Sequence, residues 1–569
     1  MRTKGKMARS CSIIANNGGR RALRLALCIA AGLCVLLLLA VAAPQLFYPL
    51  WFDQGAFAAC ADVLRHAGVM YRDCWEVRGP ATAIAYAIPM SLSSSPVAIH
   101  LFDLLWQAAT AVVLVLLARR LFGTRAAIIA GVLYWLMVAS VNYWAAAQAE
   151  SFANLFFVLS LYAAWRVGDG AQAGKRRGWQ LAPGMWLALS GACIGILFWF
   201  KYPFALFGLA PALLVLLRQP PASASPRRVQ SLLLLGGGCL AVVLLGLATF
   251  AVDGALGDLQ RQVAYDIATF NNVSLDNRLA WFRTLFIEEI VAFVNRGNTP
   301  TAGFKDTVPQ LTVLGRGYPY VFGLMAAGLA LGAWQRQRRA AALTGLGYLA
   351  LVLAISLWQG HFYRYHFLIA LPAMALLAGA SAMRLEWRSP PARLISILIR
   401  LAPLVGFAIA TAGLGATMLP WLRDAFDNAI LQRKPVEALY LESNLAPYTS
   451  LAQAITRDTL PVDRIVVFSD VPAIYPLAQR QNGTRFPYLR WAQESGSEAL
   501  RAIYAQEFLD DMQRSQPRYF VLTQPGFPWQ QADFISLYKS LPDINRYVET
   551  NYHYVGENGP FLLFLRNAP

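Results

Sequence analysis

Long apolar runs, separated by short polar segments, dominate the first three quarters of the chain. A helix crosses the hydrocarbon core of a bilayer with about 20 residues, and most of these runs approach that length. The pattern therefore predicts about eleven membrane-spanning helices. They cover 24–47, 98–118, 125–144, 149–166, 181–200, 202–217, 229–252, 319–335, 341–358, 366–383 and 398–420.

The basic residues between the runs predict how these helices are oriented. Lys and Arg are concentrated in the cytoplasmic loops of membrane proteins. A basic tail precedes the first run, and every second loop after it carries at least three basic residues. These are Arg119, Arg120 and Arg125; Arg166, Lys175, Arg176 and Arg177; Arg218, Arg227 and Arg228; Arg336, Arg338 and Arg339; and Arg384, Arg388 and Arg393. We therefore expect a cytoplasmic N-terminus and a C-terminus on the outer side.

This topology divides the chain into three parts. Residues 1–23 form a basic cytoplasmic tail, 24–422 a transmembrane domain, and 423–569 an outer domain. Two long outer loops, 48–97 and 253–318, belong to the transmembrane domain. The first apolar run follows a basic stretch, as in a signal peptide, but it exceeds the 7–15 apolar residues typical of a secretory signal. We interpret it as a retained span.

The last part of the chain resembles an ordinary water-soluble domain. Continuous apolar runs at 464–468, 518–522 and 561–565 predict buried strands, and 497–514 predicts an amphipathic helix. Because no nucleotide fingerprint, metal spacing or catalytic triad appears there, we expect a small α/β domain that serves as a cap or recognition domain. The predicted fold class is mostly α, a polytopic helical bundle with a C-terminal soluble α/β domain.

Composition agrees with a membrane protein. Of the 569 residues, 57% are hydrophobic and 14% are charged, whereas soluble domains carry about 25% charged residues. The mean hydropathy is +0.44. The net charge of +18 is attributed to orientation in the bilayer, since many basic residues lie in the short loops. No nucleic-acid motif or basic-aromatic surface accompanies it, so we expect no nucleic-acid partner.

The first outer loop holds the densest group of candidate functional residues. Asp53 follows the first span and begins a short amphipathic helix that ends at Gly68 and would lie at the membrane surface. Glu76 and Arg78 precede a second apolar segment that begins at Pro80. Ionisable groups at membrane depth are costly and tend to mark functional sites.

Two cysteines, Cys60 and Cys74, share this loop. If the loop faces an oxidising compartment, they can form a disulfide. The sequence alone leaves this pairing open against two free buried thiols.

The loop resembles the first outer loop of the GT-C glycosyltransferases that use polyprenyl-phosphate sugars. The bacterial protein O-mannosyltransferase-like enzymes and the lipid A aminoarabinose transferases are the nearest groups. The shared pattern comprises Asp53, Gly68, Tyr71-Arg72-Asp73, Trp75-Glu76, Arg78 and Pro80. The family more often has Lys-Pro where this chain has Arg78-Gly79-Pro80, which shifts the alignment of Arg78 by up to one residue.

Further segments extend the resemblance, which covers about the first 220 residues and then 355–385. Glu150 opens the fourth helix, where relatives often carry an acid, and Lys201-Tyr202-Pro203 matches a recurrent basic position. The segment His361-Phe362-Tyr363-Arg364-Tyr365-His366 resembles the Arg/His/Tyr-rich stretch before a Pro-containing helix in many bacterial members.

The resemblance implies a hexosyl- or pentosyltransferase in the inner membrane of a bacterium. It would move a sugar from a polyprenyl-phosphate donor to a lipid, glycan or protein acceptor on the periplasmic face. Asp53 is implied as the base, and direct displacement would invert the anomeric centre. Substrate binding would fall to Glu76, Arg78, Glu150, Lys201, Tyr363, Arg364 and His366. Of these, Arg78, Lys201 and Arg364 would stabilise the phosphate.

We expect no cofactor and no protein metal site, while a divalent metal ion stays open. His361 and His366 are poorly spaced as zinc ligands.

The same residues also have structural interpretations. Asp53 suits a helix N-cap, Glu76 and Arg78 suit a surface ion pair, and Lys201 and Arg364 suit interfacial anchors. Two other functions stay open: a flippase or transporter of lipid-linked glycans, and a polysaccharide ligase or polymerase of similar architecture. Transporters usually place charges or broken helices near the midplane between inverted repeats, and no clear repeat appears in this sequence.

Overall fold

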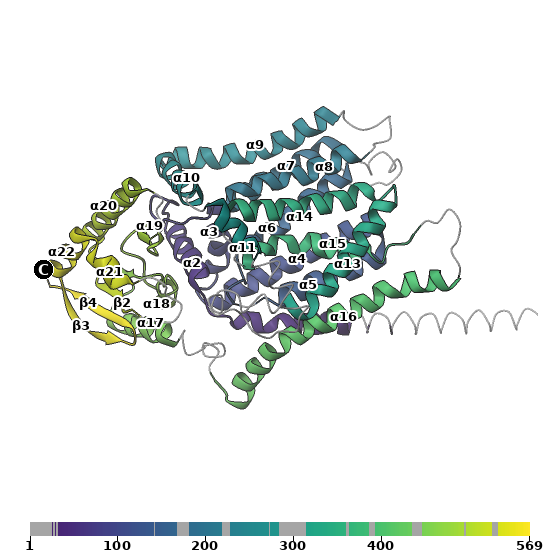
Figure 1. Ribbon diagram of the computed structural model, residues 1–569. Coiled ribbons are helices and arrows are strands. Elements are labelled where there is room, and N and C mark those ends of the chain that lie inside the picture. The colour runs from purple at the N-terminus through teal and green to yellow at the C-terminus, as the bar shows by residue number, and fades with distance from the viewer. Residues whose placement is uncertain are drawn as a thin grey trace, which may run out of the picture.

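Figure 1 shows the computed structural model, in which a bundle of long helices carries the C-terminal domain at one end. The structure describes residues 26, 29, 32–141, 143–167, 181–218, 228–271, 274–283, 314–359, 364–385, 393–434, 446–493, 497–525 and 533–568.

Helices overlap all the predicted apolar runs. The bundle begins with a helix over 32–42 and the 3-10 helix η1 (Ala43–Phe47). It continues with α4 (Pro96–Phe122), α5 (Thr124–Ala139), α6 (Ala149–Arg166), α7 (Pro183–Phe200), α8 (Leu209–Leu217), α9 (Arg228–Val252), α13 (Leu314–Trp334), α14 (Arg339–Gln359), α15 (Leu371–Ala380) and α16 (Arg393–Phe426). The 3-10 helices η2 (Tyr202–Gly208) and η4 (Arg364–Ala370) lead into α8 and α15.

Length and composition qualify several of these helices as membrane spans. Within the described residues, five are long and apolar enough on their own: Pro96–Phe122, Pro183–Phe200, Arg228–Val252, Arg339–Gln359 and Ile399–Leu419. Four shorter apolar helices cover Thr124–Ala139, Tyr202–Leu217, Tyr318–Trp334 and Tyr365–Ala380. The chain is thus a multi-pass membrane protein, while the exact number of eleven spans stays a prediction.

Four shorter helices lie at the end of the bundle nearest the C-terminal domain: α2 (Phe52–Arg65), α3 (Pro80–Met90), α10 (Leu256–Asn271) and α11 (Leu275–Arg283). The segment Gly32–Phe47 bends by 76° into α2. Residues 53–61 of α2 are all buried, so this helix is covered on more than the one apolar face that the sequence predicted. The reason is that the C-terminal domain packs over it. A Cβ on Gly55 would lie 2.4 Å from the backbone nitrogen of Ala473 in that domain.

The C-terminal domain is a small α/β unit, as predicted. Its elements are α17 (Ala446–Asp458), β1 (Ile465–Phe468), α18 (Ile474–Ala478), α19 (Arg490–Gln493), α20 (Glu498–Ser515), β2 (Tyr519–Thr523), α21 (Phe534–Lys539), α22 (Pro542–Asn551), β3 (Tyr552–Asn558) and β4 (Phe561–Arg566). The strand order is β1-β2-β4-β3. Only the β1–β2 pair is parallel among the described strands.

The three predicted strands and the predicted helix are confirmed as β1, β2, β4 and α20. Strand β3 had no apolar run to reveal it, because most of its residues are exposed at the edge of the sheet. Helix α16 continues through the predicted domain boundary at 423, and a turn of π-helix, η5 (Asp427–Leu431), follows it.

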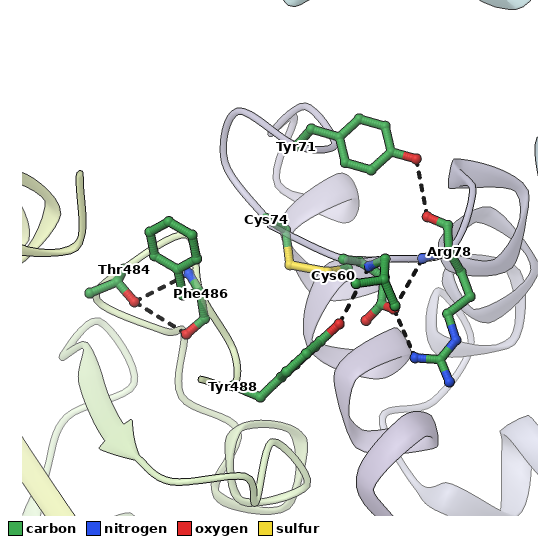
Figure 2. Close-up of a disulfide and its surroundings, with 9 residues drawn as sticks. Cys60, Tyr71, Cys74, Arg78, Thr484, Phe486 and Tyr488 are labelled. Atoms are coloured by element: carbon green, nitrogen blue, oxygen red, sulfur yellow. Dashed lines mark hydrogen bonds and ion pairs between the residues drawn. A yellow bond between two sulfur atoms is a disulfide. The ribbon is translucent and has the colours of Figure 1, made fainter. Parts of the chain in front are cut away.

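A disulfide joins Cys60 of α2 to Cys74, with their Cα atoms 5.4 Å apart (Figure 2). It ties the segment that carries Glu76 and Arg78 to the buried helix that carries Asp53. Since disulfides persist in oxidising compartments, the bond supports the prediction that this loop lies on the outer side.

Replacing Cys60 and Cys74 together by Ser tests this tie. The closed loop of 15 residues, from a separation of 14, is expected to contribute about 3 kcal/mol of stability. We expect a lower apparent melting temperature in detergent and no further decrease on adding reductant. Cys34→Ser, at an exposed free cysteine, is the control. An unchanged melting temperature in the double variant would contradict the stabilising role.

Candidate active site

A cavity of about 230 Å³ lies between the end of the helix bundle and the C-terminal domain. Its walls come from the segment before α3, the segment after α7, helix α10, the end of α14, the start of η4 and the first residue of α19. The lining residues are Val77, Arg78, Gly79, Lys201, Tyr202, Pro203, Val263, Tyr265, Asp266, Ile267, Thr269, Trp358, Gln359, Tyr365, His366 and Arg490. Ile267 and Trp358 are about half exposed, so the cavity reaches the surface.

Arg78 is held in the cavity wall by two buried carboxylates. Its Nη2 lies 2.5 Å from Asp53 Oδ1, and its Nη1 lies 3.2 Å from Glu76 Oε1. The same guanidinium donates to the Tyr365 hydroxyl at 3.1 Å and stacks over the Phe57 ring. Exposure is 7% for Asp53, 1% for Glu76 and 5% for Arg78. The interpretation of Glu76 and Arg78 as a surface ion pair is therefore excluded by their burial.

The segment around Arg78 is fixed by close backbone contacts. A Cβ on Gly79 would lie 2.0 Å from the Trp199 carbonyl oxygen, so a side chain cannot fit there. Gly79 N donates to the Phe200 carbonyl at 3.0 Å, which places Arg78 beside the end of α7. Tyr71 donates its hydroxyl to the Arg78 carbonyl at 3.0 Å (Figure 2). The glycine that separates Arg78 from Pro80 thus lets these two segments meet.

Lys201 forms the second buried ion pair of the cavity. Its Nζ lies 2.5 Å from Glu150 Oε1 at the start of α6, and it lies over the rings of Phe204 and Tyr365. The other carboxylate oxygen of Glu150 is buried and has no hydrogen-bond partner among the described atoms. An interfacial anchor keeps its charged head in water, whereas the Lys201 side chain is 11% exposed and its partner Glu150 is 2% exposed.

A polar network inside the bundle positions these carboxylates. Asp103 Oδ2 of α4 accepts from Ala147 N at 2.9 Å, and Gln107 donates to Asp103 Oδ1 at 2.8 Å. The next residue after Ala147, Gln148, donates to Asp53 Oδ2 at 3.3 Å. The turn that supplies both Gln148 and Glu150 to the site is therefore anchored on a buried aspartate that contacts neither ion pair. In the sequence, Asp103 appears only as a single acid in an otherwise apolar run.

Helix α10 supplies a residue that the sequence did not indicate. Asp266 lines the cavity and is 8% exposed, and Gln262 donates to its Oδ1 at 3.0 Å. Burial raises the pKa of the Asp266 carboxyl well above its usual range, against the opposing charge of Arg490. Tyr265 donates to the Arg490 carbonyl oxygen at 3.3 Å, so α10 and the C-terminal domain close this wall together.

Burial also shifts the pKa of two predicted site residues. It raises the pKa of Glu76, opposed by the charge of Arg78, and lowers that of Lys201, opposed by Glu150. Both shifts favour the neutral forms of these groups. An anion that binds to the wall would therefore stabilise the protonated form of Lys201 and raise its pKa.

The predicted site residues separate into three groups. Arg78, Lys201 and His366 line the cavity. Asp53, Glu76 and Glu150 lie behind the wall as partners of the two cations. Tyr363 and the side chain of Arg364 lie outside the described residues. Within the described part of the chain, no group of three His, Cys, Asp or Glu side chains is arranged to hold a metal ion.

The raised pKa of Asp266 has a measurable consequence for stability. An unfolded aspartate has a pKa of about 3.9, so above that pH the native protein holds a proton that the unfolded chain has lost. Stability therefore falls as pH rises through this window, despite the opposing charges of Arg490 and Arg78. Relative to the unsubstituted protein, the apparent melting temperature of Asp266→Asn, which cannot titrate, is therefore expected to increase as pH rises above about 4.

Asp458→Asn is the matched control, because a hydrogen bond from Arg457 lowers the pKa of this exposed carboxyl. The melting temperature of this variant relative to the unsubstituted protein should change with pH in the opposite direction. The change should be small, since exposed ion pairs contribute little to stability. A melting-temperature difference for Asp266→Asn that does not depend on pH would contradict the burial of an ionisable group there.

Comparisons with known proteins agree with this architecture. Residues 77–248 match the family model described as dolichyl-phosphate-mannose-protein mannosyltransferase. The chain is similar to ArnT from Cupriavidus metallidurans bound to undecaprenyl phosphate, with TM-score 0.54, 13% identity, and coverage of 94% of this chain and 98% of that chain. Apo ArnT from the same organism gives TM-score 0.50, 14% identity, and coverage of 94% and 98%. Among curated proteins, no sequence matches this chain.

At these identities the likeness concerns the fold. The chain has the GT-C fold, and the resemblance inferred from the first outer loop is confirmed at that level.

Proposed function

We propose that this protein is a membrane glycosyltransferase that transfers a sugar from a polyprenyl-phosphate carrier to an acceptor on the outer face. The observation that carries the proposal is the charge of the cavity. Arg78, Lys201 and Arg490 line it, against one carboxylate, Asp266. The acids that pair with Arg78 and Lys201 lie behind them. Such a wall suits a phosphate group.

The charge balance of the reaction favours this wall. A sugar linked to a polyprenyl phosphate is a phosphodiester with one negative charge, and the released polyprenyl phosphate carries up to two. The acceptor oxygen attacks the anomeric carbon while the bond from that carbon to the phosphate oxygen breaks, and the electron pair leaves on the phosphate. Preorganised cations stabilise this developing charge in a site shielded from water.

We retain Asp53 as the proposed base. Its Oδ1 accepts from Arg78 and its Oδ2 accepts from Gln148. A phosphate that binds Arg78 competes for the same guanidinium and releases one carboxylate oxygen of Asp53. The base would thus become available only when the donor is bound, and direct displacement would invert the anomeric centre.

The comparisons support the donor class. The family model that matches residues 77–248 is named for a dolichyl-phosphate mannose enzyme, and the ArnT structure of similar fold contains undecaprenyl phosphate. A cavity of about 230 Å³ is small beside the roughly 300–1,000 Å³ of ligand pockets. It favours one monosaccharide over a preassembled glycan, and therefore a transferase over a ligase or polymerase.

The positively charged alternate loops and the disulfide between Cys60 and Cys74 support a periplasmic site in a bacterial inner membrane. The proposal assigns the phosphate charge to protein cations and needs no cofactor. Transfer measured with and without a chelator tests that part.

Neutralising the Lys201 pair tests the phosphate site. Lys201→Met together with Glu150→Gln removes both charges, whereas the single change would leave a buried carboxylate unpaired. We expect near-normal stability and a transfer rate lower by roughly 100-fold. The measurement is transfer of labelled sugar to envelope acceptors from a panel of undecaprenyl-phosphate monosaccharides.

The matched control is Arg65→Gln with Asp62→Asn, which neutralises a partly exposed ion pair at the other end of α2. This double variant should keep normal transfer. If the Lys201 pair can be neutralised with equally little effect, the cavity does not hold the donor phosphate. Accumulation of carrier on the opposite leaflet without any transfer would favour a flippase.

Asp53→Asn separates base catalysis from positioning. The amide can still accept from Arg78, so the wall is expected to stay intact while kcat falls by roughly 10²–10⁴-fold. Binding of undecaprenyl phosphate should be retained or strengthened, because the neutral amide competes less for the Arg78 guanidinium. Full activity in this variant would end the assignment of Asp53 as the base, and a loss confined to phosphate binding would make it a positioning residue for Arg78.

A further inference from the structure

The wall formed by α10 carries a row of hydrogen-bonding side chains that the phosphate site does not use. Gln262, Asp266 and Thr269 are spaced four and three residues apart, so they lie on one face of the helix. Asp266 and Thr269 line the cavity, and Gln262 donates to Asp266 at 3.0 Å. The rest of this wall includes the aromatic side chains of Tyr265 and, from α14, Trp358.

Two polar atoms of this row have no hydrogen-bond partner in the part of the chain that the structure describes. Gln262 Oε1 and Thr269 Oγ1 are buried and make no hydrogen bond to the described atoms. Gln262 is 1% exposed and Thr269 is 9% exposed. Leaving a buried polar atom unpaired usually costs about 1–3 kcal/mol, so such atoms call for an explanation. A ligand that supplies the missing partner is one explanation, and their place beside a cavity favours it.

The row faces a cavity that also contains the cations. The charges of Glu76 and Arg78 both act on the Asp266 carboxyl, so the α10 row and the cations share one electrostatic environment. The cavity therefore offers cations for a phosphate. It also offers the carboxyl group of Asp266 and the hydroxyl of Thr269 from α10, with the aromatic rings of Tyr265 and Trp358 beside them. Carboxylate, hydroxyl and aromatic groups are suited to a sugar ring, because they bind its hydroxyl groups and its apolar face.

We propose that Asp266 and Thr269 of α10 bind hydroxyl groups of the donor's sugar, with Gln262 orienting Asp266. This inference rests on the proposed function and adds the sugar subsite to it. The donor sugar is favoured over a sugar of the acceptor because it is covalently attached to the phosphate, and the two must therefore occupy one cavity. The ligand class is a monosaccharide with free hydroxyl groups on the side facing α10.

The test compares two probes in detergent or nanodiscs: undecaprenyl phosphate alone, and the best-bound member of a panel of undecaprenyl-phosphate monosaccharides. Thr269→Val keeps the shape of the side chain and removes its hydroxyl. We expect it to weaken binding of the sugar-linked probe about tenfold and to leave undecaprenyl phosphate binding unchanged. Asp266→Asn should weaken the sugar-linked probe at least as much.

Stability of the unliganded protein is the second readout. Because the Thr269 hydroxyl is buried and has no partner among the described residues, Thr269→Val should keep or raise the apparent melting temperature. That result would exclude misfolding as the cause of weaker binding. Gln260→Ala is the matched control, since Gln260 is exposed on the same helix. It should leave both probes unaffected.

The outcomes separate the inference from the function on which it rests. If the unsubstituted protein binds neither probe, the proposed function fails and the sugar subsite fails with it. A second result is that the unsubstituted protein binds both probes while Thr269→Val and Asp266→Asn bind the sugar-linked probe with unchanged affinity. That result would overturn the sugar subsite alone. If these variants raise only the KM of the acceptor, α10 contacts the acceptor and the donor assignment is wrong.

Discussion

The burial of Arg78 between two carboxylates is the constraint on which the rest of the site depends. A guanidinium with 5% exposure requires compensating charge, which Asp53 supplies from the start of α2 and Glu76 supplies from two residues before Arg78. The disulfide between Cys60 and Cys74 ties the Glu76–Arg78 segment to α2, and the close approach at Gly79 holds it against the end of α7. The loop is therefore a rigid wall rather than a flexible connection between spans.

The C-terminal domain completes this environment instead of standing apart from it. Trp75 N donates to the Arg485 carbonyl at 2.6 Å, and Tyr265 packs edge-on against the Trp75 ring at 5.1 Å between centroids. Arg261 of α10 pairs with Glu507 of α20. These contacts cover the outer end of the bundle and shield the ion pairs from water, which strengthens the attraction between the paired charges.

The sequence indicated the parts of the candidate site that lie close together in the chain. The spans followed from apolar runs, and Asp53, Glu76 and Arg78 followed from one loop with a recognisable order of residues. Asp266 could not be found this way, because α10 reads as an ordinary amphipathic helix and its contact with the C-terminal domain, through Tyr265 and Arg490, joins segments far apart in the sequence. The same limit applied to α2. The sequence predicted that this helix lies at the membrane surface, but the C-terminal domain covers it in the structure.

The arrangement of acids behind bases has a functional consequence that the sequence could not supply. Ionised acids in front of Arg78 and Lys201 would repel an incoming phosphate, whereas acids behind these cations offset their charge and leave the cavity side of the wall positive. An arriving phosphate then meets cations that are already oriented, so little movement of the cations opposes binding. Among the described residues, the Oε2 atoms of Glu76 and Glu150 have no hydrogen-bond partner, and each carboxylate contacts its cation through Oε1. On this argument the carboxylates set the positions of the cations, and the cations set the position of the phosphate.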